Sequence, residues 1–313
     1  MDFEIPADIQ DTLDQLDAFI EAEIKPLEQQ DDNIRFFDHR REWARTDFDN
    51  DGVPRADWEA LLREMRRNRV DAALVLTSYK VTPGRPSTRA VVEATRAHPN
   101  LFVVAGLGWA SFREEDLEEI RPGVEEGRVK GLKIYPGYEP FHPNDARLSP
   151  AMAFAREHRL PVMIHSGDTY TATGKLKYSH PLHVDEIAVD HPGVEFVICH
   201  IGNPWIRDTM EVVYKNANVY TDFSGLVLGD FEDRFESYMR RQVQEMLLYG
   251  VQPEKCLYGT DWPIASMESY LDFMEELKMP PRDRKLMMYE NAIRLFKLPI
   301  DLPVIGGRPF GRL

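Results

Sequence analysis

The stretch Pro161-Val-Met-Ile-His-Ser-Gly167 is an apolar run that ends abruptly in a histidine, and the same pattern recurs along the chain. The other runs of this kind are Gly131-Leu-Lys133-Ile-Tyr-Pro136, Phe196-Val-Ile-Cys-His200 and Leu257-Tyr-Gly-Thr-Asp261. Short apolar runs without alternation are typical of buried parallel strands. The chain is therefore predicted to build a parallel sheet that carries polar groups at or near the strand ends.

Strand-like runs and charged helical stretches alternate from about residue 70 onward. The predicted strands are Asp71–Thr77, Leu101–Gly108, Gly131–Tyr135, Pro161–Ile164, Glu195–Cys199, Asn218–Asp222 and Lys255–Tyr258. The predicted helices are Thr88–Ala97, Glu114–Glu126, Ser149–Glu157, Pro181–Val189, Trp205–Lys215, Phe231–Leu248 and Met267–Leu277. Such alternation defines α/β architecture. It fits a TIM-type (β/α)8 barrel better than a doubly wound sheet, because a barrel of this type needs about 250 residues.

The first third of the chain has a different pattern of apolar and charged residues, and it contains no ordinary first barrel strand. Apolar residues recur at spacings of three and four between Pro6 and about Gln30, which predicts an amphipathic helix. A second helix is predicted from Pro54 to about Arg67. We therefore expect an N-terminal helical segment over residues 1–67. The barrel would occupy residues 68–313, with a first strand that is atypical or missing.

The bulk properties exclude several classes of protein. The formal net charge is −15 and the pI is about 5.1, so the surface would repel nucleic acid and anionic membrane. No apolar run approaches the roughly 20 residues that span a bilayer, and no nucleotide-binding glycine motif follows a strand. The acidic start does not look like a signal peptide, and Cys199 and Cys256 lie in apolar runs. These features predict a cytoplasmic protein without nucleic-acid or membrane partners.

The polar groups of these strands form a chemically coherent set. All carboxyl-terminal strand ends of a barrel point to one face, so Lys133, His165, His200 and Asp261 are expected to converge there. Neutral imidazole and carboxylate groups bind zinc and similar divalent ions, which activate water and polarise carbonyl groups. Asp261 would move a proton. Lys133 would be a charge partner of the substrate or, if carboxylated, a bridge between two metal ions.

Each of these residues also has a purely structural interpretation. A histidine at a strand end is often a hydrogen-bonded core residue, Asp261 would cap a turn, and Lys133 would be held in an ion pair. Their common position in barrel order favours the functional interpretation. Other histidines are expected at the surface or behind the site: His142, His180, His183 and His191. Aromatic residues near the strand ends are expected to wall an apolar pocket: Trp109, Tyr135, Tyr138, Trp205 and Trp262.

Residues 70–298 resemble an amidohydrolase-related family that includes uracil-like and aromatic-acid decarboxylases, lactonases and small hydrolases. The resemblance is carried by Val70-Asp-Ala-Ala-Leu-Val-Leu76, Gly131–Pro136, Pro161–Gly167, Cys199–Gly202, Asn218-Val-Tyr-Thr-Asp-Phe-Ser-Gly225, Tyr258–Pro263 and Tyr289–Phe296. It implies that His165 is a metal ligand, that His200 is a ligand or a catalytic histidine, and that Asp261 is a ligand and proton shuttle. The cofactor that it implies is a divalent metal ion, zinc or else manganese.

The sequence departs from that family at the first strand, which normally ends in Asp-x-His-x-His or Glu-x-His and supplies two ligands. The nearest candidate is Ile34-Arg-Phe-Phe-Asp38-His39-Arg-Arg-Glu42, with one histidine and with arginines at ligand positions. Arginine stays cationic and cannot bind a metal, so we expect weaker metal binding than in a typical member. The gap would be filled by residues 35–38, covered by the N-terminal helices, or closed by a partner chain.

Residues 1–67 resemble the amino-terminal helices of a bacterial acyl-CoA dehydrogenase instead. The stretches that carry this second resemblance are Asp17-Ala-Phe-Ile-Glu21 and Asn33–Asp47. The flavin-binding and catalytic-base regions of that family have no counterpart here, so neither a flavin nor dehydrogenase activity is expected. The chain is interpreted as a splice in which such a start replaces the first barrel strand, with the junction near residues 64–70.

Two functions from different classes follow from these observations. The first is a metal-dependent hydrolase of a small carboxylate, lactone or amide, or a related decarboxylase, in which Asp261 moves the proton and His200 stabilises negative charge. The second is a metal-free, non-catalytic barrel that binds a ligand or serves as an interaction scaffold, which the missing first-strand histidines favour. The expected partner is a small-molecule substrate. Barrels of this family often pair, so a homodimer is also an expected assembly.

Overall fold

Seven parallel strands form a single curled sheet in the computed structural model, which describes residues 7–26, 58–79, 86–171 and 173–300. Each strand pairs with its neighbours in the chain, in the order β1 to β7. The strands are β1 Ala73–Leu76, β2 Leu101–Leu107, β3 Val129–Ile134, β4 Val162–Ile164, β5 Phe196–Ile198, β6 Val219–Asp222 and β7 Cys256–Leu257. The predicted parallel barrel architecture is therefore confirmed.

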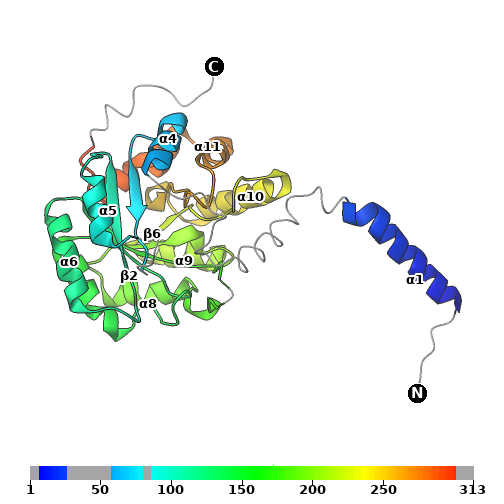
Figure 1. Cartoon of the computed structure of the whole chain (residues 1–313), viewed down its shortest axis with the longest axis horizontal. Coiled ribbons are helices and arrows are strands. Elements are labelled where there is room, and N and C mark those ends of the chain that lie inside the picture. The colour runs from blue at the N-terminus through cyan, green and yellow to red at the C-terminus, as the bar shows by residue number, and fades with distance from the viewer. Residues whose placement is uncertain (1–6, 27–57, 80–85, 172, 301–313) are drawn as a thin grey trace.

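Helices follow the strands and cover the outside of the sheet (Figure 1). They are α4 Trp58–Asn68, α5 Thr88–Thr95, α6 Glu114–Glu125, α7 Ser149–His158, α8 Leu182–Asp190, α9 Ile206–Lys215, α10 Asp233–Tyr249, α11 Met267–Glu276, α12 Pro281–Lys285 and α13 Asn291–Leu295. All strands and helices predicted after residue 70 are present, with ends shifted by a few residues at most. None of the helices among the described residues is long and apolar enough to cross a membrane.

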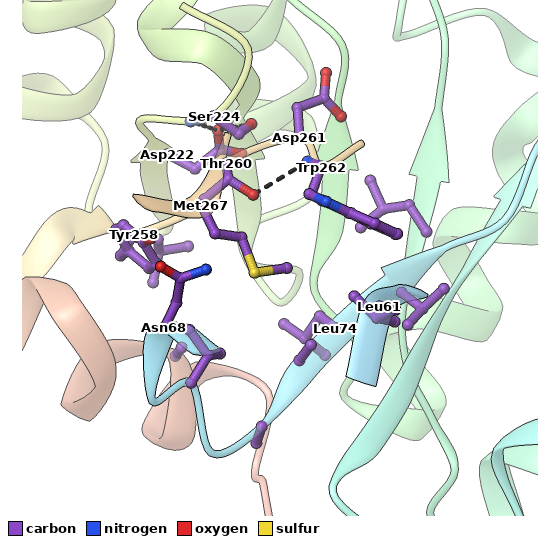
Figure 2. A pocket seen from close by; sticks show the side chains of 18 of the residues that line it. Leu61, Asn68, Leu74, Asp222, Ser224, Tyr258, Thr260, Asp261, Trp262 and Met267 are labelled. Carbon is purple, nitrogen blue, oxygen red and sulfur yellow. Dashed lines mark hydrogen bonds between the residues drawn. The ribbon is translucent and has the colours of Figure 1, made fainter. Parts of the chain in front are cut away.

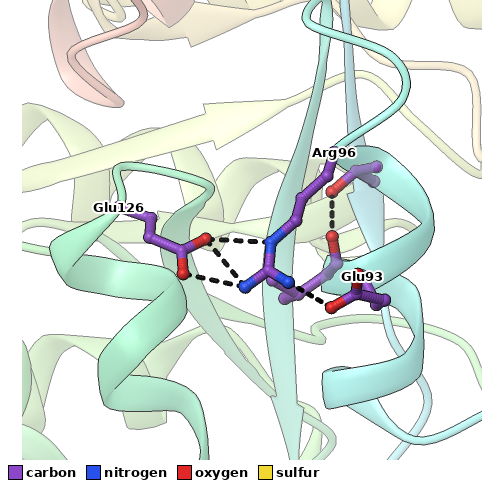
Figure 3. Close-up of polar contacts among 5 residues, drawn as sticks. Glu93, Arg96 and Glu126 are labelled. Atoms are coloured by element: carbon purple, nitrogen blue, oxygen red, sulfur yellow. Dashed lines mark hydrogen bonds and ion pairs between the residues drawn. The ribbon is translucent and has the colours of Figure 1, made fainter.

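Ion pairs on the surface also link neighbouring helices. One such ion pair links the end of α5 to the end of α6. Arg96, just after α5, donates to both carboxylate oxygens of Glu126, with one contact of 2.8 Å, and it also pairs with Glu93 (Figure 3). Glu126 is the main reason why the pKa of Arg96 is raised. Since these side chains are solvent-exposed, the ion pair helps to set the relative position of α5 and α6 more than it stabilises the fold.

The sheet is not closed within the described part of the chain. β1 pairs with β2 alone and β7 with β6 alone, so each has one edge without a described partner strand. Helix α4 lies beside this opening and packs against α11, where Arg67 forms a 3.0 Å ion pair with Glu268. The candidate for an atypical first strand, Ile34–Glu42, lies outside the described residues.

The predicted N-terminal helix is present as α1, Ala7–Phe19, followed by a π-helical turn at Ile20–Ile24. Its apolar stripe is solvent-exposed: Ile9, Leu13, Leu16 and Phe19. This helix therefore contributes nothing to the described core. The second predicted helix is present as α4, and its four expected residues before Trp58 lie outside the described residues.

The core has an outer and an inner part, and the inner part positions the site. Apolar side chains inside the barrel form a compact cluster: Val104, Met163, Val197, Cys199 and Leu257, with Leu295 and Phe296 from the end of α13. The strand register pairs Lys133 with Met163 and Met163 with Val197. Lys133 therefore lies in the same inward-facing row as Met163 and Val197.

Candidate active site

His165 lies directly after β4, where its backbone N–H continues the ladder by donating to the Ile134 carbonyl oxygen at 3.0 Å. Its ring is buried, with 4% of the residue exposed, and packs 4.6 Å from the Tyr138 ring. Burial, followed by the nearby charges of His200 and Lys133, lowers the pKa of His165 well below its usual value. The ring is thus neutral, and its Nε2 atom, 2.9 Å from the Asp168 carbonyl oxygen, must be the donor.

His200 lies at the end of β5 in a short turn, and its backbone is left-handed, with φ 63° and ψ 27°. The Nδ1 atom is 2.8 Å from the Ser224 carbonyl oxygen, which can only accept, so Nδ1 carries the proton. Within the described residues, Nε2 is left as the ring nitrogen without a hydrogen bond. The centres of the His165 and His200 rings are 5.1 Å apart, so these two predicted residues converge.

Asp261 follows β7 and also has a left-handed backbone, with φ 63°. A Cβ atom built on Gly225 would lie 2.5 Å from His200 Nδ1 and 3.2 Å from Asp261 Oδ2. The His200 ring and the Asp261 carboxylate therefore meet beside the bare backbone of Gly225. Thr260 supports the turn by accepting a hydrogen bond from the Trp262 N–H at 3.1 Å (Figure 2).

Lys133 lies deeper than the other predicted site residues. Its Nζ atom is 2.6 Å from Cys199 Sγ and 5.6 Å from the centre of the Tyr135 ring, and 2% of the residue is exposed. Burial raises the pKa of the Cys199 thiol, and the Lys133 charge opposes that rise. Both cysteines of the chain are free and buried. The contact of the lysine with a thiol shows that Lys133 faces the barrel interior.

A cavity of about 1150 Å³ runs from the strand ends into the barrel interior and toward α4 and α11. Its polar lining includes Lys133, His200, Asp222, Ser224 and Asp261. Figure 2 shows Asp222, Ser224 and Asp261 beside the same space as the apolar side chains Leu61, Leu74 and Met267. His165 does not line this cavity, although its ring contacts that of His200.

The candidate ligand side chains have the right chemistry for a divalent metal ion, but too few of the described ones are placed together to hold it. Each of the two histidines has one ring nitrogen held by a backbone carbonyl, which is how metal-binding histidines are usually oriented. However, no three His, Cys, Asp or Glu side chains are placed to hold a metal within residues 7–26, 58–79, 86–171 and 173–300. Asp38, His39 and Glu42 lie outside that part. The ligand set of His165, His200 and Asp261 thus stays a prediction.

Asp222 and Ser224 contact His200 directly, but they were not predicted as site residues. Asp222 is the last residue of β6, and Oδ1 of this buried carboxylate accepts the His200 backbone N–H at 3.1 Å. The signal was present, because Asp222 ends an apolar run in the same way as His165 and Asp261 do. The predicted pocket aromatics Tyr135 and Tyr138 do lie near the site.

Three of the other described histidines form a separate group. The His142 and His183 rings are 4.3 Å apart, and the His180 ring is 6.4 Å from that of His183 and 4.7 Å from that of Trp205. His183 lies on α8, and His142 and His180 lie in loops, as predicted. This group is not part of the site.

Comparison with known proteins agrees with this geometry. A family model described as amidohydrolase matches residues 44–298. A curated relative, the gamma-resorcylate decarboxylase of Polaromonas sp. (strain JS666 / ATCC BAA-500), is 25% identical over 128 residues. That match covers 34% of this chain and 36% of the relative, so it spans about a third of each protein.

Solved structures share the fold over most of the chain. An uncharacterised TIM-barrel protein from Bordetella bronchiseptica has 20% identity and a TM-score of 0.63, with coverage of 83% of this chain and 90% of that one. A protein described as a 2-pyrone-4,6-dicarboxylic acid hydrolase from Pseudomonas putida has 16% identity and a TM-score of 0.59, with coverage of 79% and 89%. A dihydroxybenzoic acid decarboxylase from Polaromonas sp. JS666, solved with manganese and 2-nitroresorcinol, has 16% identity and a TM-score of 0.56, with coverage of 78% and 87%.

Proposed function

Because this chain belongs to the amidohydrolase family, we propose that it is a metal-dependent enzyme acting on a small carboxylate, lactone or amide. The reaction is hydrolysis or the loss of a carboxylate group as carbon dioxide. It takes place at the carboxyl ends of β4, β5 and β7, where His165, His200 and Asp261 are found. A decarboxylase relative and a hydrolase neighbour support both reaction classes.

The observation that carries this proposal is the convergence of residues from three separate strands. The His165 and His200 rings lie 5.1 Å apart, and Asp261 approaches His200 beside Gly225. Residues 165, 200 and 261 are remote in sequence, so a packing role for each would not require them to meet. Catalytic groups of TIM barrels gather at this face of the barrel.

His165, His200 and Asp261 would hold the metal, which is manganese or zinc. Two solved decarboxylase neighbours contain manganese, which favours manganese as the first ion to test. When bound, a divalent ion supplies polarisation of a substrate carbonyl or carboxylate oxygen. The tautomers support this role, since His165 Nδ1 and His200 Nε2 are the ring nitrogens left unprotonated.

The side chains of the chain itself provide the remaining chemistry. The Asp261 carboxylate accepts a proton and returns it to the product. Lys133 attracts the substrate carboxylate into the cavity, because a buried ammonium group is a strong charge in a medium of low polarity. His200, at the cavity wall, would offer its unprotonated Nε2 atom to the metal ion, because its Nδ1–H is donated to Ser224. The apolar lining from Leu61, Leu74 and Met267 excludes water from the bound substrate.

The second candidate function is a metal-free barrel that binds a ligand without reaction. It is favoured by one observation, the absence of a complete three-residue ligand group within the described residues. The two candidates differ in one measurable property, which is the metal content of the purified protein.

The deciding experiment is elemental analysis of protein purified without chelator and of the Asp261→Asn variant. Asp190→Asn, an exposed position on α8, is the matched control. The proposal expects about one manganese or zinc ion per chain in wild type and control, and a loss in Asp261→Asn. Metal-free wild-type protein that also takes up no manganese in dialysis would support the scaffold instead.

A substrate panel separates the two reaction classes. 2,6-Dihydroxybenzoate and 5-carboxyvanillate report decarboxylation through release of carbon dioxide, and 2-pyrone-4,6-dicarboxylate reports ring-opening hydrolysis. Turnover of one class, lost in Asp261→Asn and kept in Asp190→Asn, would assign the reaction. Metal-loaded protein without turnover of any panel member or of simple lactones and amides would contradict the enzymatic proposal.

A further inference from the structure

The carboxylate of Asp222 is a buried hydrogen-bond acceptor that serves the His200 turn. Its Oδ1 atom accepts the backbone N–H of His200 at 3.1 Å and that of Ser224 at 2.9 Å. The same oxygen accepts the Ser224 hydroxyl at 2.5 Å. Asp222 itself is 3% exposed. A single carboxylate oxygen thus joins the end of β6 to the residue that follows β5.

The turn that Asp222 holds has an unfavourable backbone. His200 has φ 63° and Ile201 has φ 45°, a left-handed region that β-branched and other non-glycine residues rarely adopt. Such conformations are strained and persist only where surrounding contacts impose them. The hydrogen bond from the His200 N–H to Asp222 is a contact of that kind.

The His200 ring is fixed through Ser224. The Ser224 hydroxyl oxygen lies 3.0 Å from His200 Nδ1, and the Ser224 carbonyl oxygen lies 2.8 Å from the same atom. Because the Ser224 hydroxyl donates its proton to Asp222, its lone pairs are free to accept from Nδ1–H. Both Ser224 oxygens therefore favour the Nδ1–H tautomer, which is not the one that histidine prefers in water.

The second carboxylate oxygen of Asp222 faces the barrel interior. Oδ2 is buried and has no hydrogen-bond partner among the described residues. Asp222 raises the pKa of the Cys199 thiol, after burial, whereas Lys133 lowers it, so both charged groups lie beside this thiol.

We propose that Asp222 and Ser224 are positioning residues that hold His200 in its strained turn and as the Nδ1–H tautomer, so that Nε2 is presented to the metal or substrate. This inference rests on the proposed function for its purpose, but the geometry of His200 can be tested without any reaction. Residues of this type commonly change metal affinity about 10- to 100-fold when they are lost.

Nuclear magnetic resonance of protein labelled with nitrogen-15 in histidine tests the tautomer directly. The His200 signals are assigned by their loss in His200→Gln. The metal-free wild type is expected to show Nδ1 protonated and Nε2 unprotonated. Asp222→Ala, which removes the acceptor oxygen, and Ser224→Ala are expected to shift His200 toward the Nε2–H form, whereas Ser224→Thr keeps the hydroxyl and the wild-type pattern. A wild type in the Nε2–H form, or Asp222→Ala and Ser224→Ala variants with unchanged His200 signals, would overturn the proposal.

Titration with manganese provides the second measurement. Ser224→Ala and Asp222→Ala are expected to raise the dissociation constant for manganese about 10- to 100-fold, with Ser224→Thr and Asp190→Asn close to wild type. Equal affinities in all variants would contradict the positioning role. If the wild type bound no manganese while the tautomer result held, the proposed metal dependence would fail and the positioning of His200 would stand.

Discussion

The ammonium group of Lys133 meets the thiol of Cys199 inside the barrel, with Nζ 2.6 Å from Sγ, and not a carboxylate or a histidine ring. A buried lysine whose hydrogen-bond partner is a neutral thiol depends on charges further away for its stability. Among the described residues, Asp222 is a second charged group beside the same thiol. Lys133 and Asp222 are therefore expected to be coupled energetically.

Double-mutant analysis tests this coupling. Lys133→Met should lower the free energy of unfolding by about 3 kcal/mol, because it leaves the Asp222 carboxylate buried without a compensating charge. The additional change Asp222→Asn should recover a part of that loss. Denaturant unfolding of both single variants and of the double variant gives the coupling free energy, and additive effects would show that the two residues are independent.

Gly225→Ala should disrupt the site through direct contact. The added methyl group would lie 2.5 Å from His200 Nδ1, so the ring must move, and kcat/KM should fall about 100-fold or more. Gly229→Ala is a matched control, because Gly229 also has a positive φ, 74°, but no neighbouring atom of the described residues lies within 4 Å of the position that its added methyl group would occupy. Equal losses of activity in both variants would assign the effect to backbone strain alone.

Stability of the metal-free protein should depend on pH through His165. The pKa of His165 is well below 6.5 in the folded protein, mainly because of burial, so the unfolded chain binds a proton that the folded protein does not. Stability is thus complete above the unfolded pKa and falls below about pH 6.5, by up to about 1.4 kcal/mol per pH unit. Unfolding curves between about pH 8 and pH 5 should show a shallower decline in His165→Gln. An identical decline would exclude His165 as its source.

Leu132→Ala should destabilise the fold by about 2–5 kcal/mol, since this side chain is fully buried in the core between sheet and helices. Leu248→Ala is the control, because 87% of Leu248 is exposed, and its effect should stay within about 0.5 kcal/mol. The comparison is made by chemical denaturation. A loss at Leu248 as large as that at Leu132 would indicate that the end of α10 is covered by something outside the described residues.

The strands and helices after residue 70 were predictable because the strands are short apolar runs and the helices are longer stretches rich in charged residues. His165, His200 and Asp261 were predictable as neighbours for a related reason, since parallel strands place their carboxyl ends on one face. The ligand roles of these residues stay predictions. The resemblance of the first 67 residues to an acyl-CoA dehydrogenase also stays a prediction, and the family match begins inside that segment, at residue 44.

Other features of the site depend on interactions that no local pattern encodes. The depth of Lys133 follows from the register of β3 against β4, and its contact with Cys199 joins residues 66 positions apart. The left-handed backbone of His200 and Asp261 is hidden in the sequence, because neither residue is a glycine. The role of Asp222 becomes apparent only when β6 is placed beside the turn that follows β5.

The sequential order of the strands bears on how the protein folds. Each described strand pairs only with strands adjacent to it in the chain, so no described pairing requires a loop longer than one strand–helix unit. The entropy lost in closing such loops grows only slowly with their length. The sheet can therefore grow by adding one unit at a time to an existing edge. A nucleus formed by any two neighbouring units, such as those of β2 and β3, would suffice to start it.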